Sequence, residues 1–143
     1  MLGFETVGNA TLTVFDDGPV LSTDPWIDGN PYFGSWTHPY EISETNISNI
    51  INSKYIWLSH GHPDHIDSKS YKYLHNAIIL IPDHFGDRIF HYFDKYFECI
   101  KIKSDVWFEI SKNVRIKSFA DWNQDAALVV EIQKKDCICN MND

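Results

Sequence analysis

The sequence predicts an α/β sandwich, in which helices pack on the outer faces of β-sheets. Two patterns support this fold class: strand-length apolar runs alternate with segments of helical periodicity between residues 43 and 97, and a run of strands follows. The length of 143 residues, with 43% hydrophobic and 15% aromatic residues, is sufficient for one domain with a sizeable core. We therefore expect a single domain over residues 1–143.

The first part of the chain favours strands, then a loop, then a helix. Short strands are expected at residues 4–7, 10–15 and 19–23, because glycine and asparagine punctuate the apolar runs. Residues 25–42 form a loop rich in aromatics and turn formers. Ser43 is positioned to cap a helix that ends near Ser53, with isoleucines at helical spacing.

The middle and final parts continue the alternation. Residues 55–58 are typical of a buried strand, and a helix near 68–76 follows with Asp67 or Ser68 as its cap. The continuous apolar run 77–81 predicts a parallel strand buried on both faces, and phenylalanines at helical spacing predict an amphipathic helix over 84–97. We expect His84 and His91 at the surface or boundary of that helix. Further strands are expected at 98–103, 106–110, 113–119, 126–133 and 136–141.

The most informative segment follows the strand at 55–58 and reads His-x-His-x-Asp-His. His60, His62, Asp64 and His65 place three imidazoles and a carboxylate within six residues. Imidazole suits divalent transition metals, and a carboxylate adds a harder ligand or a proton acceptor. In an extended or turning segment, His60 and His62 can bind one ion while Asp64 and His65 reach toward a second. This spacing predicts a metal site.

This motif and the earlier segment Thr23-Asp24-Pro25-Trp26 resemble the metallo-β-lactamase-fold hydrolases. The strand that ends in Thr-Asp-Pro-Trp looks like the branch that contains ascorbate-6-phosphate lactonase, N-acylphosphatidylethanolamine phospholipase D and CMP-N-acetylneuraminate hydroxylase. The resemblance implies a four-layer αβ/βα sandwich with metals between its two halves. It also implies that Asp24 supports the metal loop through hydrogen bonds.

The sequence departs from the family pattern in two respects. Members are usually longer, so we expect this chain to hold the first half and a few strands of a truncated domain. Asp143 falls where the family places an aspartate that bridges two metals, and a compact single-half protein would need a second subunit, for example in a homodimer. Where the family supplies a third histidine, this chain has Asp121 and, as a weaker candidate, Asp125; a strand-connecting turn is the other interpretation of that segment.

The aromatic loop at 25–42 borders the active-site mouth in the family. His38 and Trp26 are therefore candidates for the substrate pocket, although the aromatic residues of this loop could equally pack it onto the sheet.

The resemblance implies metal-assisted hydrolysis. One or two divalent ions, zinc first and manganese or iron as alternatives, would activate water against a lactone, phosphodiester or similar ester, with Asp64 positioned as a proton acceptor. The small-molecule substrate would be a phosphorylated sugar, a lactone or a phosphodiester. Two alternatives remain open: a component of an oxidoreductase similar to the CMP-sialic acid hydroxylase, and a non-catalytic metal-binding fragment.

Composition excludes several other functions. The net charge of −8 argues against non-specific nucleic-acid binding, which requires clustered lysine and arginine. The sequence shows no apolar run long enough for a transmembrane segment and no evident signal peptide, so we expect a cytoplasmic protein. The three cysteines argue against a disulfide framework, and we expect Cys137 and Cys139 to be buried on one core face.

Overall fold

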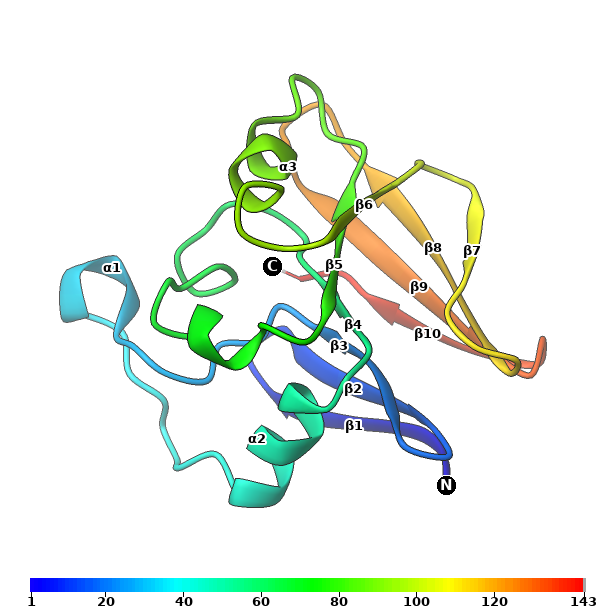
Figure 1. Ribbon diagram of the computed structural model, residues 1–143, viewed down its shortest axis with the longest axis horizontal. Helices are drawn as coiled ribbons and strands as arrows, with labels where there is room; N and C mark the ends of the chain where they lie inside the picture. Colours follow the sequence, from blue (N-terminus) through cyan, green and yellow to red (C-terminus); the bar gives the residue numbers. More distant parts are fainter. Residues whose placement is uncertain (143) are drawn as a thin grey trace.

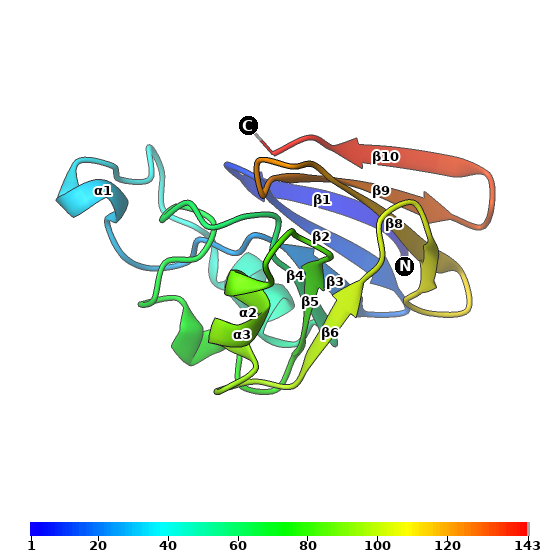
Figure 2. The same cartoon turned by 90° about the horizontal axis from the view of Figure 1, so that it is seen from above.

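Two β-sheets pack face to face in the computed structural model, which describes residues 1–142 (Figures 1 and 2). The larger sheet has six strands in sequential order: β1 (Leu2–Gly8), β2 (Thr11–Asp16), β3 (Pro19–Thr23), β4 (Tyr55–Trp57), β5 (Ile78–Pro82) and β6 (Cys99–Ile102). β1, β2 and β3 are antiparallel neighbours, and β3 to β6 run parallel. The smaller sheet is antiparallel in the order β10 (Asp136–Asn140), β9 (Ala126–Ile132), β8 (Val114–Ala120) and β7 (Trp107–Glu109).

The two longer helices lie on the same side of the molecule. Figure 2 shows α2 (Glu44–Ile51) and α3 (Arg88–Phe93) on the face of the six-stranded sheet that points away from the four-stranded sheet. Within residues 1–142, no helix covers the outer face of the four-stranded sheet. The predicted α/β sandwich is confirmed, but helices cover only one of its two outer faces. No helix in this part of the chain has the length and apolar character needed to cross a membrane.

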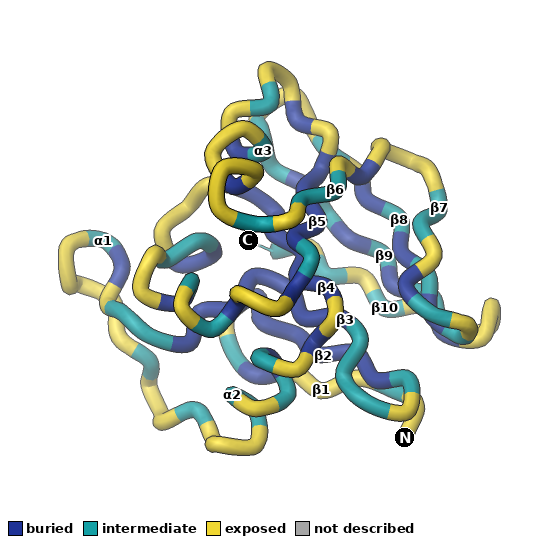
Figure 3. Tube along the Cα trace, viewed as in Figure 1, coloured by how far each residue is buried: buried dark blue, intermediate teal, exposed yellow. Residues whose placement is uncertain are grey.

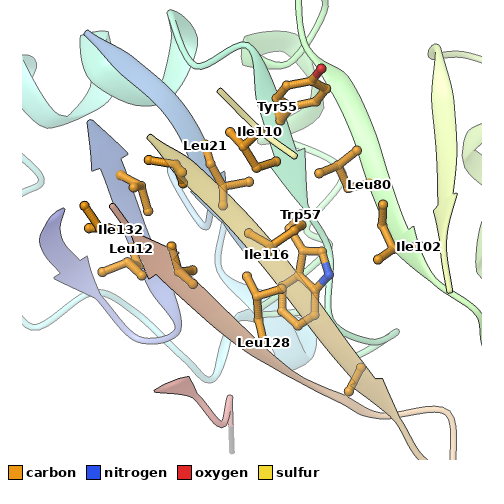
Figure 4. Packing of buried hydrophobic residues seen from close by; sticks show 14 residues of the cluster. Leu12, Leu21, Tyr55, Trp57, Leu80, Ile102, Ile110, Ile116, Leu128 and Ile132 are labelled. Carbon is orange, nitrogen blue, oxygen red and sulfur yellow. The ribbon is translucent and has the colours of Figure 1, made fainter. Parts of the chain in front are cut away.

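Alternating side chains on β4 build two hydrophobic layers. Tyr55 and Trp57 point into the core between the sheets, together with residues of β8 and β9 (Figure 4). Ile56 and Leu58 point to the other side and pack beneath the helices. Strands that are buried on both faces read as continuous apolar runs, which is how this strand and β5 appear in the sequence. Figure 3 shows the burial of this central region and the exposure of the loop around α1 (Pro31–Gly34).

Both helices predicted for the middle of the chain are shorter in the structure. The segment 68–76 contains only a 3-10 turn, Tyr71–Tyr73, because the Ser70 hydroxyl accepts the backbone N–H groups of Ile27 and Asp28 and ties the chain to the preceding loop. The predicted helix 84–97 begins at Arg88, since Gly86 and Asp87 have φ angles of 79° and 54° that an α-helix does not tolerate.

The expected burial of the Cys-x-Cys pair is wrong. Cys137 and Cys139 are both exposed, whereas Ile138 between them packs against the inner core. The pair lies on β10, an edge strand, on the sheet face that the described helices leave uncovered. The alternation of side chains along β10 was predicted correctly, but the sequence does not reveal which face of this strand is covered by the rest of the protein.

Candidate metal centre

The metal motif begins where β4 leaves the sheet. The last ladder contact is the N–H of Leu58, which donates to the carbonyl of Leu80 on β5 at 3.0 Å. At Ser59, side chains of the neighbouring segments take over: its N–H donates to Asp24 Oδ1 at 2.7 Å, and its carbonyl accepts from His84 Nε2 at 2.8 Å. The loop that follows therefore starts from a rigid point at the carboxyl ends of parallel strands, where α/β proteins commonly build their sites.

Three imidazoles gather in this loop. The ring centroid of His60 lies 4.3 Å from that of His62 and 4.2 Å from that of His65. His60 and His65 are buried, with exposed fractions of 4% and 1%, while His62 is exposed. Burial and, secondarily, the neighbouring His65 lower the pKa of His60, so its ring is neutral at neutral pH. Neutral imidazole is the form that binds a metal.

Asp64 is buried and is held from two distant segments. Asn9 Nδ2 donates to its Oδ2 at 2.9 Å, and the Tyr32 hydroxyl donates to its Oδ1 at 2.8 Å. Burial alone would raise the pKa of Asp64, but these two hydrogen bonds outweigh that effect and lower it. Asp64 Oδ2 also lies 3.5 Å from His65 Nε2. The carboxylate is therefore charged at neutral pH and lies next to an imidazole of the cluster.

Asp24 lies behind the loop with no exposed surface. Its Oδ1 accepts from the N–H of Ser59, and its Oδ2 lies 3.2 Å from His65 Nδ1. Its own N–H donates to the carbonyl of Trp57 at 2.8 Å. The carboxylate thus contacts the nitrogen of an imidazole ring and the backbone that carries the loop, and its supporting role at a metal site stays a prediction.

The two candidates for the missing third histidine differ in their surroundings. Asp121 Oδ1 accepts the N–H groups of Asn123 and Asp125, at 2.8 and 3.0 Å, and so closes a turn between β8 and β9. Asp125 Oδ1 lies 3.4 Å from His60 Nδ1. Of these two candidates, Asp125 is therefore the one whose carboxylate lies near an imidazole of the cluster.

The predicted pocket residues pack against each other. Trp26 is 4% exposed, and its ring lies 3.9 Å from the ring of His38, centroid to centroid. Trp26 Nε1 donates to the carbonyl of Gly29 at 3.1 Å, which fixes the ring within its own loop. The role of Trp26 and His38 in substrate binding stays a prediction.

The remaining predicted metal ligand, Asp143, lies outside the described residues.

The sequence-based prediction gave no supporting role at the centre to four residues: Asn9, Tyr32, Ser59 and His84. His84 was expected at a helix surface, but it is 4% exposed and contacts the residue before the motif. Its position directly after a buried parallel strand was a usable signal, because neighbouring strand ends meet at one edge of the sheet. Asn9 and Tyr32 carried no such signal, since they reach Asp64 from remote loops.

The donor set fits a divalent metal by its chemistry. It combines three imidazoles, of which that of His60 is neutral, with a charged carboxylate beside them and a fully buried carboxylate behind them, which is the layered arrangement typical of metal sites. Residues 1–142 alone do not place three or more histidine, cysteine, aspartate or glutamate side chains in an arrangement that could hold an ion. The described residues therefore supply candidate ligands and their support, but not a complete coordination shell.

No protein-family model matches the sequence. Over 82 residues the chain is 30% identical to a protein from Mycolicibacterium smegmatis that is named as a Rieske 2Fe-2S iron-sulfur protein; the match covers 55% of this chain and 15% of that protein.

Solved structures match the fold along almost the entire chain. One is a possible metal-dependent hydrolase from Veillonella parvula, with a TM-score of 0.70 and 11% identity over 100% of this chain and 63% of that one. Another is CmlA, a diiron β-hydroxylase from Streptomyces venezuelae, with a TM-score of 0.72 and 9% identity over 97% of this chain and 29% of that one. The chain thus has a metallo-β-lactamase-like α/β fold, and it spans less than two thirds of the length of these relatives.

Proposed function

We propose that this chain carries the metal-binding part of a metal-dependent hydrolase that activates water against a lactone, a phosphodiester or a similar ester. The observation that carries the proposal is the cluster of three imidazoles with ring separations of 4.3 and 4.2 Å, at the end of a buried strand and backed by the buried Asp24. Buried imidazoles and carboxylates at one point are costly to a fold unless they are paired or bind a cation.

The residues divide into ligands and supports. His60 and His62 would hold a first cation, and Asp64 and His65 a second. Asn9 and Tyr32 hold Asp64 in its charged form, which favours it as a cation ligand. Asp64 was also predicted to accept a proton, but a carboxyl with a lowered pKa is a weak base near neutral pH. Its main role in this proposal is therefore that of a ligand.

The bound cation would supply Lewis acidity and lower the pKa of a coordinated water to about 7. Zinc is the first candidate because imidazole predominates among the donors. A carboxylate near the first site, from Asp125, would shift preference toward iron or manganese. Asp121 and Asp143 stay predicted ligands. The resemblance of the Thr-Asp-Pro-Trp segment to the lactonase and phospholipase branch favours a phosphorylated sugar, lactone or phosphodiester as substrate.

Hydrolysis of model substrates tests this function. Protein reconstituted with zinc or manganese is expected to hydrolyse an aryl phosphodiester or an aliphatic lactone above the metal-only rate, and His62→Ala is expected to lose at least about 100-fold of that rate, since loss of a ligand removes the metal-activated water. His91→Ala, which removes an exposed imidazole from α3, should retain the full rate. Equal rates for the His62 and His91 variants would refute the proposal.

A second function is favoured by two comparisons together. The Mycolicibacterium relative is named as a Rieske iron-sulfur protein, and CmlA is a diiron hydroxylase. The contact of Asp125 with His60 adds a carboxylate, which suits iron. The alternative proposal is therefore an oxygenase component that receives electrons from a partner, because the exposed Cys137 and Cys139 are too few to hold an iron-sulfur cluster. Iron retained through purification, with dioxygen consumption dependent on an added reductant, would favour this function over hydrolysis.

A further inference from the structure

A pocket of about 350 Å³ lies between α3 and the loop of the histidine motif. Gly61 and Ile66 of this loop form one wall, Tyr71 of the 3-10 turn forms another, and α3 forms the third. Gly61 stands between His60 and His62 in the sequence. A ligand in the pocket would therefore contact the backbone that carries two candidate metal ligands.

The floor of the pocket is apolar and aromatic. Ile89 and Phe93, four residues apart on α3, are 6% and 0% exposed. The ring of Phe93 lies 5.2 Å from that of Tyr71 and 5.3 Å from that of Tyr92, centroid to centroid, in edge-to-face arrangements. Aromatic side chains favour a further ring in such offset or edge geometry. Pockets of roughly this volume, with mainly apolar walls and few polar groups, are typical small-molecule sites.

Arg88 supplies a positive charge at the rim of the pocket. Arg88 and Tyr92 are four residues apart, so they share one face of α3, and both are exposed. The neighbouring carboxylate of Asp87 is already paired with Lys101 at 2.7 Å, and within residues 1–142 Arg88 forms no ion pair. The chain has a net charge of −8, yet no acidic side chain in this part of it neutralises this guanidinium. An anionic ligand group would supply the missing partner.

Gly61 keeps the pocket open on the side of the metal loop. A Cβ atom at this position would lie 3.6 Å from Ile89 Cδ1, which is an ordinary contact distance. Any side chain longer than a methyl group would therefore extend into the space between the loop and α3. The glycine within the motif leaves room for a ligand directly beside the candidate metal ligands.

We propose that this pocket binds an aromatic group joined to a negatively charged one, with the ring against Tyr92 and Phe93 and the charge at Arg88. The inference rests on the proposed function in one respect: it identifies this ligand as the substrate of the neighbouring centre, for example the aryl part of a phosphodiester. Binding in the pocket itself uses only side chains of this chain. It can therefore be measured without a metal.

Calorimetric titration of the metal-free protein with naphthyl phosphate tests the proposal. We expect saturable binding, tighter than that of octyl phosphate or methyl phosphate, since a flat ring packs against the aromatic walls. NMR of the same titration should shift the backbone amide signals of Gly61, Ile89 and Phe93, which places the ligand in this pocket.

Two variants separate the contributions of charge and ring. Arg88→Gln is expected to weaken the binding of naphthyl phosphate about 10-fold, because a charge-assisted contact is lost, and to leave the binding of uncharged naphthol within about twofold. Tyr92→Ser should weaken both ligands about 10-fold, because an aromatic wall is removed. Tyr92→Phe retains the ring and should bind both ligands as the wild type does.

The matched control for Arg88→Gln is Lys95→Gln, which removes an exposed positive charge just beyond α3 and outside the pocket. No saturable binding by the wild type overturns the inference. So does tighter binding of octyl phosphate than of naphthyl phosphate, or equal affinity for naphthyl phosphate in the Arg88 and Lys95 variants. Binding with the expected dependences supports the pocket as a ligand site even where zinc-loaded protein hydrolyses no ester, a result that refutes the proposed function alone.

Discussion

Asp24 combines full burial with contacts to the backbone and to an imidazole of the metal loop, and these determine the effect of its replacement. Asp24→Ala leaves the N–H of Ser59 without its acceptor and removes the carboxylate from His65 Nδ1. We expect the affinity for zinc to fall about 10- to 100-fold. Because a buried donor is left unsatisfied, the free energy of unfolding should also fall by about 1–3 kcal/mol. Competition with a chromophoric chelator and urea unfolding measure the two effects.

Asp28→Ala is the matched control for this variant. Asp28 lies on the same loop, but its carboxylate is partly exposed and pairs with Lys72 at the surface. Its removal should leave zinc affinity within about twofold of the wild type, since surface ion pairs contribute little. If Asp24→Ala binds zinc as tightly as Asp28→Ala, Asp24 does not support the metal loop.

The sequence predicts the candidate ligands better than their surroundings. His60, His62, Asp64 and His65 are neighbours along the chain, so spacing alone brings them together. His84, like Asn9 and Tyr32, reaches the centre only after the strands and loops are in place. Ser59 directly precedes His60 in the sequence, but its contacts with Asp24 and His65 also depend on the folded structure. The sequence favoured Asp121 over Asp125, because it does not show which of the two carboxylates the turn itself uses.

At the scale of elements, Asp16 joins the end of β2 to the turn between β7 and β8. It accepts hydrogen bonds from Ser111 Oγ at 2.6 Å and from Asn113 Nδ2 at 2.9 Å. We expect Asp16→Ala to lower the free energy of unfolding by about 1–2 kcal/mol at neutral pH, because bonds to a charged acceptor are lost. Urea unfolding measures the change, and Glu41→Ala, which removes an exposed carboxylate from the loop before α2, is the control.

This contribution should depend on pH in a defined direction. The hydrogen bonds from Ser111 and then Asn113 lower the pKa of Asp16 in the folded protein below the ordinary aspartate value. A lowered pKa stabilises the fold at pH values above the ordinary one, and the stabilisation is lost as the pH falls through the folded pKa. The difference between wild type and Asp16→Ala should therefore be full at pH 6 and shrink below about pH 4. A difference that stays constant down to pH 2.5 would contradict this account.

Strands were predicted more accurately than helices for a physical reason. Buried parallel strands appear as continuous apolar runs, and β4 and β5 begin and end within a residue or two of the predicted ranges. Helix length in this chain depends on contacts and backbone angles that periodicity does not report. Ser70 binds the backbone of a distant loop, and Asp87 adopts a positive φ just before α3 begins. Both features interrupt a helix that the spacing of the side chains alone would allow: the contact of Ser70 shortens the first one, and the backbone of Asp87 delays the start of α3.

At the scale of the whole molecule, the inner core joins the sheets and positions the candidate centre. Trp57, immediately before the loop, packs against residues of β8 and β9 (Figure 4). Asp125, which contacts His60, lies just before β9 on the other sheet. The two sheets therefore approach each other at the centre, as the sequence-based fold class implied. The uncovered face of the four-stranded sheet was not predicted, because a strand pattern does not show whether a helix covers it.

The central claim is that this loop binds a divalent cation, and equilibrium metal analysis tests it most directly. The chain should be purified without chelators, equilibrated with zinc, manganese or iron, and analysed for bound metal per chain together with His62→Ala and His91→Ala. We expect about one to two equivalents in the wild type and in His91→Ala, and less than about half of that in His62→Ala, because a coordinating imidazole is lost. A wild type without bound metal, or a His62 variant that binds as much as the wild type, would contradict the account.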